Sequence, residues 1–268
     1  MIPKIIHYCW FGGAPKPESV LRCIDSWRKK CPDFEIREWT EKDIDVNQNA
    51  YTKEAYEAKA WGFVPDYLRL WIVYHYGGVY LDTDVQVVKD LTPLLNNRAF
   101  VGIERDSRNH VALGLGFGAE PGNDFIFKHM KMYEDLHFIL SDGSYNRTPS
   151  PQYTTQLLRQ LGYDQERGGR QELADLMIYS EDYFCPKSYA TGTTRKSRNT
   201  YSIHHYDASW YTEDERIQWK KSQTIARLRY PFDKINLIRY NLMIKVLGFE
   251  RYEKLKMVLK GKHQDVKD

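Results

Sequence analysis

The chain has 268 residues, and its 39 Lys or Arg against 36 Asp or Glu give a nearly balanced charge that indicates no class of partner. It has no apolar run of about 18 residues, and its four cysteines form neither a C-x-x-C pair nor a dense framework. These features exclude a membrane-spanning helix and a disulfide-stapled scaffold. We therefore expect one large α/β domain, with or without an appendage, in a reducing cytoplasmic setting. The N-terminus lacks a signal-peptide pattern, which argues against secretion.

The first 39 residues have the pattern of a βαβ unit. Ile2–Tyr8 is typical of a buried strand, Pro17–Lys30 of an amphipathic helix and Phe34–Trp39 of a second strand. His7 lies within the first strand, where we expect a hydrogen-bonded core histidine. The loop after that strand contains Gly12-Gly13 but no G-x-G-x-x-G fingerprint, so a dinucleotide-binding fold is unsupported.

A second helix over 51–61 leads into the stretch around which the chain is organised, residues 63–85. Pro65 fits the first turn of a helix, and Gly77 fits a left-handed C-cap. Val79–Leu81 is typical of a strand buried on both faces. The sequence therefore predicts a helix, a glycine break and a strand that ends at the aspartates following it.

Two carboxylates, Asp82 and Asp84, follow this strand directly. Residues i and i+2 can point the same way, and ligands bind beyond the carboxyl ends of strands in such sheets. The pair suits Mg²⁺ or Mn²⁺ bridging a diphosphate, although aspartates after strands also serve as turn formers or helix caps. Asp66 and Arg69 share a face of the preceding helix, which favours an acid–base pair aimed at the same end of the sheet. The alternative is an ion pair on the protein surface.

The remainder of the first 212 residues alternates strands and helices, and Gly114, Gly116 and Gly118 suggest a close backbone approach to substrate or to a neighbouring strand. Glu104 ends a strand, where a solvated loop acid is favoured over a sugar contact. His204 and His205 are adjacent in a late strand, so at most one of them faces the site. The expected strands are 100–103, 113–119, 177–179 and 201–205, and the expected helices are 125–140 and 152–161.

Three motifs together resemble glycosyltransferase family 32, which includes bacterial capsule and lipopolysaccharide transferases and yeast mannosyltransferases and is related to clostridial glucosylating toxins. The central one combines Asp66-x-x-Arg69 with the run YGGVYLDTD that ends at Asp84. The run IPKIIHYCWFGG over 2–13 resembles the family's first strand and nucleotide loop, and IHHYDASW over 203–210 resembles its closing motif. Pro65 departs from the small polar residue more common there.

This resemblance implies a GT-A-type fold with a central mixed sheet, over residues 1–212. It also implies a divalent metal, Mn²⁺ or Mg²⁺, held by Asp84. Asp82 is then expected on the ribose and donor sugar or in the outer shell of the metal. Imidazole can complete the coordination of Mn²⁺, and we favour His205 as that ligand, with His204 as the fallback.

The other family positions concern the donor, a nucleotide diphosphate sugar. By resemblance, Asp66 and Arg69 hold hydroxyls of the donor sugar and orient it. Trp10 is expected to stack on the nucleobase, with a role in the core as the alternative. Ser209 and Trp210 are expected to contact the diphosphate or cover the donor.

The activity implied is metal-dependent transfer of a hexose, with retention of anomeric configuration, to a glycan or lipid-linked oligosaccharide in bacterial surface polysaccharide synthesis. A UDP-sugar is the favoured donor and GDP-mannose the second choice, and no nucleic acid is involved. Retention runs through a carboxylate nucleophile or through front-face attack, and the sequence singles out no nucleophile. The alternatives are a catalytically inactive carbohydrate- or nucleotide-binding scaffold and a metal-dependent phosphohydrolase.

Residues 213–268 are expected to form a basic helical appendage with helices over 216–229, 233–247 and 250–260. Residues 216–268 contain 14 Lys or Arg and 5 Asp or Glu, a net charge of +9. Basic residues beside an apolar stripe suit a helix on an anionic membrane surface, which predicts a peripheral location on the inner face of the cytoplasmic membrane. A helical hairpin packed on the catalytic domain is the alternative.

Overall fold

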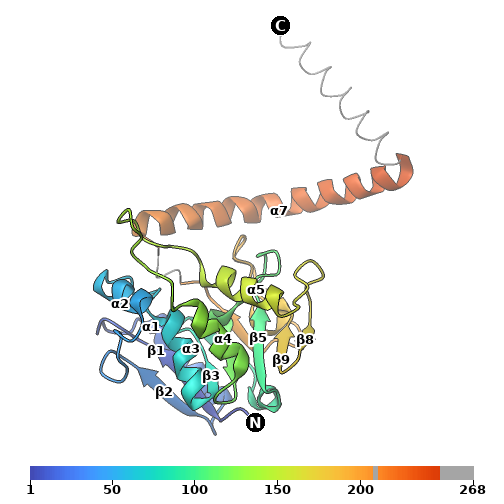
Figure 1. Ribbon diagram of the computed structural model, residues 1–268. Coiled ribbons are helices and arrows are strands. Elements are labelled where there is room, and N and C mark those ends of the chain that lie inside the picture. The colour runs from blue at the N-terminus through green and yellow to red at the C-terminus, as the bar shows by residue number, and fades with distance from the viewer. Residues whose placement is uncertain (208–210, 248–268) are drawn as a thin grey trace. The chain divides into compact units, whose positions relative to one another are not determined.

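The structure is a computed structural model that describes residues 1–207 and 211–247 (Figure 1). The chain divides into two compact units, Met1–Ile217 and Gln218–Asp268, and the second is described for residues 218–247. The first unit contains a central sheet of parallel and antiparallel strands with helices packed against it. This arrangement confirms the expected α/β fold with a central mixed sheet.

The sheet has eight strands in the order β2-β1-β3-β7-β5-β9-β8, with β6 paired to β5. β1 is parallel to β2 and β3, β7 runs antiparallel to β3 and β5, and β9 is parallel to β5. A separate antiparallel pair joins β4 to β10. The strands are β1 Ile5–Cys9, β2 Glu35–Trp39, β3 Gly78–Tyr80, β4 Val85–Val87, β5 Ala99–Ile103, β6 Val111–Ala112, β7 Phe117–Ala119, β8 Gln171–Leu173, β9 Leu176–Tyr179 and β10 Ser202–His204.

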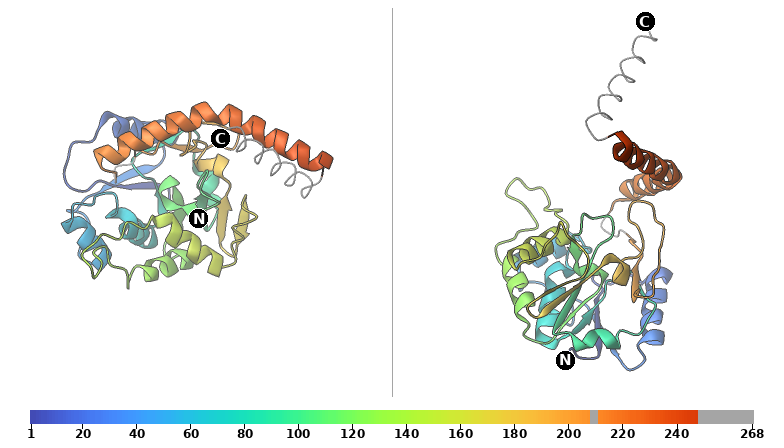
Figure 2. Two further views of the ribbon diagram at one scale, coloured as in Figure 1. Left: turned by 90° about the horizontal axis from the view of Figure 1, so that it is seen from above. Right: turned by 90° about the vertical axis from the view of Figure 1, so that its right-hand side faces the viewer.

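Helices cover both faces of this sheet, with α3, α4 and α5 on one side and α1 on the other (Figure 2). Helix α3 packs against β1 and against α4, and its buried leucines and isoleucine join the main core. The helices are α1 Glu18–Lys30, α2 Ala50–Glu57, α3 Pro65–Tyr76, α4 Asp124–Met132, α5 Ser150–Gln160, α6 Glu181–Phe184 and α7 Glu213–Leu247, with 3₁₀ turns at Thr92–Asn96 and Leu113–Leu115.

The turn between α3 and β3 depends on Gly77, which ends the helix with a φ of +63°. A Cβ there would lie 2.7 Å from Pro121 Cδ and 2.8 Å from Pro3 Cδ, so a larger residue does not fit. The Gly77 carbonyl accepts a hydrogen bond from Nε2 of His7 (2.8 Å), and His7 Nδ1 accepts one from Nε1 of Trp39 (3.1 Å). His7 is therefore the hydrogen-bonded core histidine that was expected, and burial lowers its pKa to about 4.

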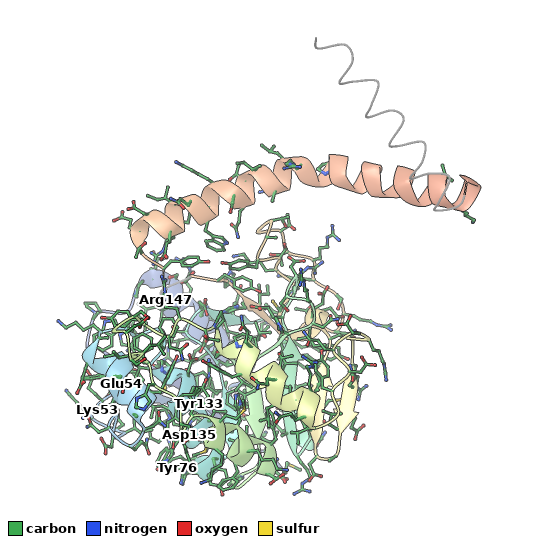
Figure 3. The ribbon with its side chains drawn as sticks, turned by 45° about the horizontal axis from the view of Figure 1, so that its top comes forward. Lys53, Glu54, Tyr76, Tyr133, Asp135 and Arg147 are labelled. Atoms are coloured by element: carbon green, nitrogen blue, oxygen red, sulfur yellow. The ribbon has the colours of Figure 1, made fainter. Side chains whose placement is uncertain are left out.

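Two elements in the middle of the chain differ from expectation. The predicted strand over 113–119 is interrupted, because Gly116 has a φ of +118° and ends a 3₁₀ turn before β7 begins. The predicted helix over 125–140 ends at Met132. The chain beyond it is held by Glu54 of α2, whose carboxylate accepts from the amides of Phe138 (2.8 Å) and Ile139 (2.9 Å); Figure 3 labels Glu54 with Tyr133 and Asp135.

The second unit also differs from expectation where it is described. Helix α7 runs without a break from Glu213 to Leu247, whereas the sequence predicted two helices over this stretch. Pro231 lies inside it and removes one backbone N–H donor without ending the helix. The predicted helix over 250–260 lies outside the described residues. Within the described residues, no helix is long and apolar enough to cross a membrane.

Candidate active site

The two aspartates lie in the short connection between β3 and β4, just beyond the carboxyl end of β3, an interior strand of the central sheet. Asp82 has a side chain that is 33% exposed, and Asp84 one that is 14% exposed, so both are accessible only in part. The Asp82 amide lies 3.4 Å from the carbonyl of Gly114, in the 3₁₀ turn before β7. The connection is therefore held between the sheet and the two-stranded pair β4–β10.

Gly114 makes room for the Asp82 carboxylate. A Cβ at this glycine would lie 2.2 Å from Asp82 Oδ2 and 3.6 Å from Nη1 of Arg69. Ordinary contacts between nonbonded atoms are about 3.5 Å or more, so even an alanine would force the carboxylate to move. The close approach suggested by the glycine-rich stretch is thus made to a site residue on the neighbouring segment.

His204 completes a cluster with the two aspartates. The register of β10 against β4 pairs His204 with Val85, and this brings Nε2 of His204 to 3.2 Å from Oδ1 of Asp84. The ligand atoms of Asp82, Asp84 and His204 all lie within 4.8 Å of one another. Among the described residues, this is the group of His, Cys, Asp or Glu side chains whose spacing suits a metal ion.

The structure places His204 beside the aspartates, and not His205, which was the histidine favoured from the sequence. The two histidines face opposite ways, and Nε2 of His205 lies 3.1 Å from Oε1 of Gln86. His205 contributes its backbone instead, since its amide donates to the Asp84 carbonyl (3.0 Å). The alternation of side chains was foreseen, but which histidine faces the aspartates depends on the register with β4, which the sequence does not show.

The donor set fits a divalent cation. Two carboxylates and one imidazole are ligands that Mn²⁺ and related ions accept. Burial opposes ionisation of Asp84, but His204 and the amide of Asp207 outweigh it and lower the pKa of Asp84 to about 2. Burial raises the pKa of Asp82 to about 6, because the opposing charge of Arg69 does not offset it. Asp84 is therefore ionised at neutral pH and holds its charge beside His204.

Asp66 and Arg69 form a buried ion pair on α3, not a surface one. Asp66 is 6% exposed and Arg69 3%. Nη2 of Arg69 donates to Oδ1 of Asp66 and to Oγ of Ser150 (2.6 Å), and its Nη1 lies 3.7 Å from Oδ1 of Asp82. Burial raises the pKa of Asp66, against the opposing charge of Arg69 and the hydrogen bond from Ser150. The Arg69 guanidinium thus links the Asp66 carboxylate to the metal-type cluster, which consists of Asp82, Asp84 and His204.

Of the residues predicted to contact the donor nucleotide, the structure describes Trp10. Trp10 follows β1, is partly exposed, and donates from Nε1 to the carbonyl of Ala14 (2.7 Å). The Lys16 ammonium lies 5.8 Å from the centre of the Trp10 ring. The indole is thus held by its own loop with a ring face beside a cation. Ser209 and Trp210 lie outside the described residues.

Two residues near the cluster were not selected from the sequence. Ser150, the first residue of α5, binds Arg69 directly, but an isolated serine in a turn-rich stretch carries no signal of that role. Glu104 was expected to be a solvated loop acid. It is instead partly buried, and burial raises its pKa against the opposing effects of His204 and Tyr206. The signal that was available for Glu104 was its place at the end of a strand.

Comparison with known proteins agrees with this geometry. Residues 17–101, which include both aspartates and the α3 ion pair, match the family model described as "Glycosyltransferase sugar-binding region containing DXD motif". The resemblance drawn from the motifs is thereby confirmed for this region. The chain is 31% identical over 107 residues to inositol phosphoceramide mannosyltransferase 1 of Schizosaccharomyces pombe, covering 37% of this chain and 33% of that protein.

The chain has three further similarities, to one curated protein and two solved structures. The chain is 29% identical over 153 residues to mannosyl phosphorylinositol ceramide synthase SUR1 of Saccharomyces cerevisiae, covering 52% of this chain and 37% of the relative. It thus spans about a third of the length of the yeast relatives it matches. Among solved structures, a PaToxG glycosyltransferase aligns with a TM-score of 0.45 at 20% identity, over 59% of this chain and 69% of that one. A galactosyltransferase, LgtC, aligns with a TM-score of 0.39 at 16% identity, over 82% and 96%.

Proposed function

We propose that this protein, whose residues 17–101 carry the DXD sugar-binding region, is a metal-dependent glycosyltransferase that moves a hexose from a nucleotide diphosphate sugar to a glycan acceptor. One observation carries the proposal. Arg69 joins the Asp66 carboxylate to the cluster of Asp82, Asp84 and His204, so a sugar-orienting pair and a metal-type donor set lie side by side. A nucleoside diphosphate hexose has sugar hydroxyls for the pair and phosphate oxygens for the metal-type donor set.

The chemistry asked of these residues is charge stabilisation and positioning. Cleavage of the sugar–phosphate bond leaves negative charge on the departing diphosphate and oxocarbenium character on the sugar. A divalent cation held by Asp82, Asp84 and His204 neutralises charge on that diphosphate when bound. Asp66 accepts hydrogen bonds from sugar hydroxyls, and Arg69 fixes the orientation of both Asp66 and Asp82.

We further propose retention by front-face attack. Two acids of the site, Asp66 and Asp84, already have strong partners, which argues against either of them as the carboxylate nucleophile. Asp66 is paired with Arg69, and Asp84 with His204 and the amide of Asp207 (2.9 Å). In this scheme the acceptor oxygen bonds to the anomeric carbon on the face that the diphosphate leaves, and its proton goes to a diphosphate oxygen.

The donor is proposed to bind with its base on Trp10 and its diphosphate near 209–210. The partly exposed indole of Trp10, with Lys16 beside it, supports stacking of a nucleobase. A UDP-hexose remains the first candidate, but the yeast relatives are named as mannosyl-transferring enzymes, which favours testing GDP-mannose beside it. The proposed acceptor is a surface polysaccharide or its lipid-linked precursor.

Helix α7 is proposed to hold the enzyme at an anionic membrane surface, on the inner face of the cytoplasmic membrane. Lys220, Lys221, Arg227 and Arg229 give this part of the helix a concentration of positive charge. Apolar side chains are exposed along it, namely Ile225 (57%), Leu228 (69%) and Leu242 (58%). Cationic and apolar side chains together are what an anionic lipid surface binds.

The decisive experiment is donor turnover with a panel of nucleotide sugars and Mn²⁺, with and without carbohydrate acceptors. A transferase consumes the matching donor much faster when an acceptor is present and yields a glycosylated product. Fast acceptor-independent release of sugar phosphate or phosphate would indicate a phosphohydrolase. Thermal shifts with nucleotide sugars but no turnover with any acceptor would indicate a binding scaffold.

A further inference from the structure

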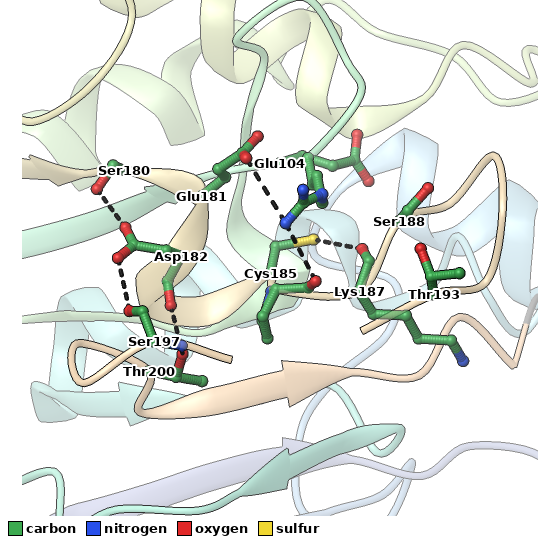
Figure 4. Close-up of polar contacts among 12 residues, drawn as sticks. Glu104, Ser180, Glu181, Asp182, Cys185, Lys187, Ser188, Thr193, Ser197 and Thr200 are labelled. Carbon is green, nitrogen blue, oxygen red and sulfur yellow. Dashed lines mark hydrogen bonds and ion pairs between the residues drawn. The ribbon is translucent and has the colours of Figure 1, made fainter. Parts of the chain in front are cut away.

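Lys187 opens a tight hairpin that lies beside the site but was not selected from the sequence. It follows α6, and a bridge pairs it with Thr194 across the turn. The Ser188 amide donates to the Thr193 carbonyl (2.8 Å), which closes the hairpin; Figure 4 shows Lys187, Ser188 and Thr193 at this turn. The lysine is thus carried on a hydrogen-bonded turn and not on a loose loop.

The ammonium group reaches the backbone that surrounds Asp84. Nζ of Lys187 donates to the carbonyl of His205 (2.5 Å). The amide of His205 donates to the Asp84 carbonyl (3.0 Å), and the amide of Asp207 donates to the Asp84 carboxylate (2.9 Å). One hydrogen bond therefore links the lysine to the segment that carries His204 and wraps the metal-type cluster.

Within residues 1–207 and 211–247, Lys187 uses only part of its hydrogen-bonding capacity. An ammonium has three donors, and among the described residues Lys187 spends one on a carbonyl and forms no ion pair within 4.0 Å. Its side chain is half-buried, and burial lowers its pKa although Asp207 and Asp84 act in the opposite direction. Charged groups removed from water are normally paired. A half-buried cation with two spare donors beside the cluster therefore suits an anionic ligand.

We infer that Lys187 binds the diphosphate of the donor and stabilises the nucleoside diphosphate as it leaves. The inference rests on the proposed transferase function. When the bond between the anomeric carbon and the phosphate oxygen breaks, its electron pair stays on that oxygen, and the acceptor oxygen forms the new bond to carbon. The acceptor proton goes to the diphosphate, and Lys187 keeps its proton throughout. Its charge supplements that of a bound metal where negative charge increases.

The test uses full-length Lys187→Met and Lys187→Arg with Lys89→Met as the matched control. Lys89 also donates from Nζ to a backbone carbonyl, that of Arg198 (3.3 Å), and its ammonium lies over the Tyr201 ring. Dissociation constants for nucleoside mono- and diphosphates with Mn²⁺ are measured by calorimetry, and kcat and KM with the preferred donor. A charge-assisted hydrogen bond predicts a loss of diphosphate affinity of roughly 10- to 100-fold in Lys187→Met.

The difference between mono- and diphosphate separates binding from structure. If Lys187 touches the diphosphate, Lys187→Met reduces the preference for diphosphate over monophosphate, Lys187→Arg restores part of it, and Lys89→Met changes nothing. A merely structural lysine would weaken the binding of mono- and diphosphate by the same factor, with or without a lower melting temperature, and that result overturns the inference. The inference is also overturned if Lys187→Met has the same nucleotide affinities, kcat and KM as an active wild-type protein. That result would not contradict the transferase function. A wild-type protein that neither binds nor turns over any nucleotide sugar overturns both.

Discussion

Substitution of Gly114 by alanine tests whether the position of the Asp82 carboxylate controls activity. The added methyl group would lie 2.2 Å from Oδ2 and 3.2 Å from Cγ of Asp82. The φ of Gly114 is not in the left-handed region, so alanine brings no backbone strain of its own. The substitution therefore acts through a single contact, and it leaves every charge of the site in place.

The size of the effect follows from the displacement required. Nonbonded contacts are about 3.5 Å at their optimum, so relief of a 2.2 Å contact moves the carboxylate by about 1 Å. A misplacement of about 1 Å in a catalytic group costs about 100-fold in rate. The same movement disturbs the contact of Asp82 with Nη1 of Arg69, now at 3.7 Å. We expect kcat to fall by about two orders of magnitude while the protein remains folded.

The assay is steady-state transfer at saturating Mn²⁺, together with thermal melting of each variant. Gly102→Ala serves as the control, because a Cβ there would meet the ring of Phe184 at 2.6 Å, a clash of similar severity against a core side chain. We expect Gly102→Ala to lower the melting temperature without a comparable loss of kcat. Gly114→Ala with near-normal kcat, or with a loss explained by unfolding alone, would refute the reasoning.

The remaining predictions concern the ion pair, the metal, acid stability and the membrane. Arg69→Lys loses the planar fork that reaches Asp66, Ser150 and Asp82, so the rate of transfer should fall roughly 100-fold while the circular dichroism spectrum is unchanged. The control is Arg98→Lys, which changes a surface ion pair with Asp175 and should retain full activity. Asp84→Asn should abolish the thermal shift caused by Mn²⁺ and the transfer activity, and turnover that survives EDTA would contradict a metal role. Burial lowers the pKa of His129 to about 3, so below about pH 6.5 the unfolded state takes up a proton that the folded state excludes. His129 should then lower the free energy of unfolding by about 2 kcal/mol between about pH 6.5 and pH 5, and in urea titrations His129→Leu should remove that contribution and leave the similar one of His7, whose pKa burial lowers to about 4. Exchange of Lys220, Lys221, Arg227 and Arg229 for glutamine should abolish co-sedimentation with anionic vesicles at low salt, and high salt should do the same to the wild type; equal binding by both proteins would exclude electrostatic docking.

Local sequence signals were sufficient for the parts of the site that come from one stretch of chain. Pro65, the apolar spacing of α3, Gly77 and the short buried strand are local features, so α3, β3 and the place of Asp82 and Asp84 were predictable. The burial of Asp66 and Arg69 was not, since an i,i+3 pair has the same spacing on a surface as in a core. Only the packing of α3 against α4 and against β1 decides between the two.

Features of the site that depend on the pairing of distant strands could not be predicted from the sequence. The alternation rule stated that only one of His204 and His205 faces the site, and the pairing of His204 with Val85 determined which one. The same limit applies to Leu113–Leu115, where a positive φ at Gly116 interrupts a run that reads as one strand. Propensity gives the type of element, whereas register and breaks depend on what lies beside it.

The division of the metal-type cluster between two distant segments has a consequence for how the site forms. Asp82 and Asp84 precede β4, and His204 ends β10, so the three donors meet only when β4 and β10 have paired. Loop closure over this separation costs entropy that the pairing and the packing of the sheet must offset. A cation that binds all three donors therefore stabilises the paired state over the open one, by an amount that grows with its free concentration. Lys187 contacts the returning segment at the His205 carbonyl, and the amide of Asp207 in that segment contacts Asp84, so binding of metal and of diphosphate should each increase the affinity for the other.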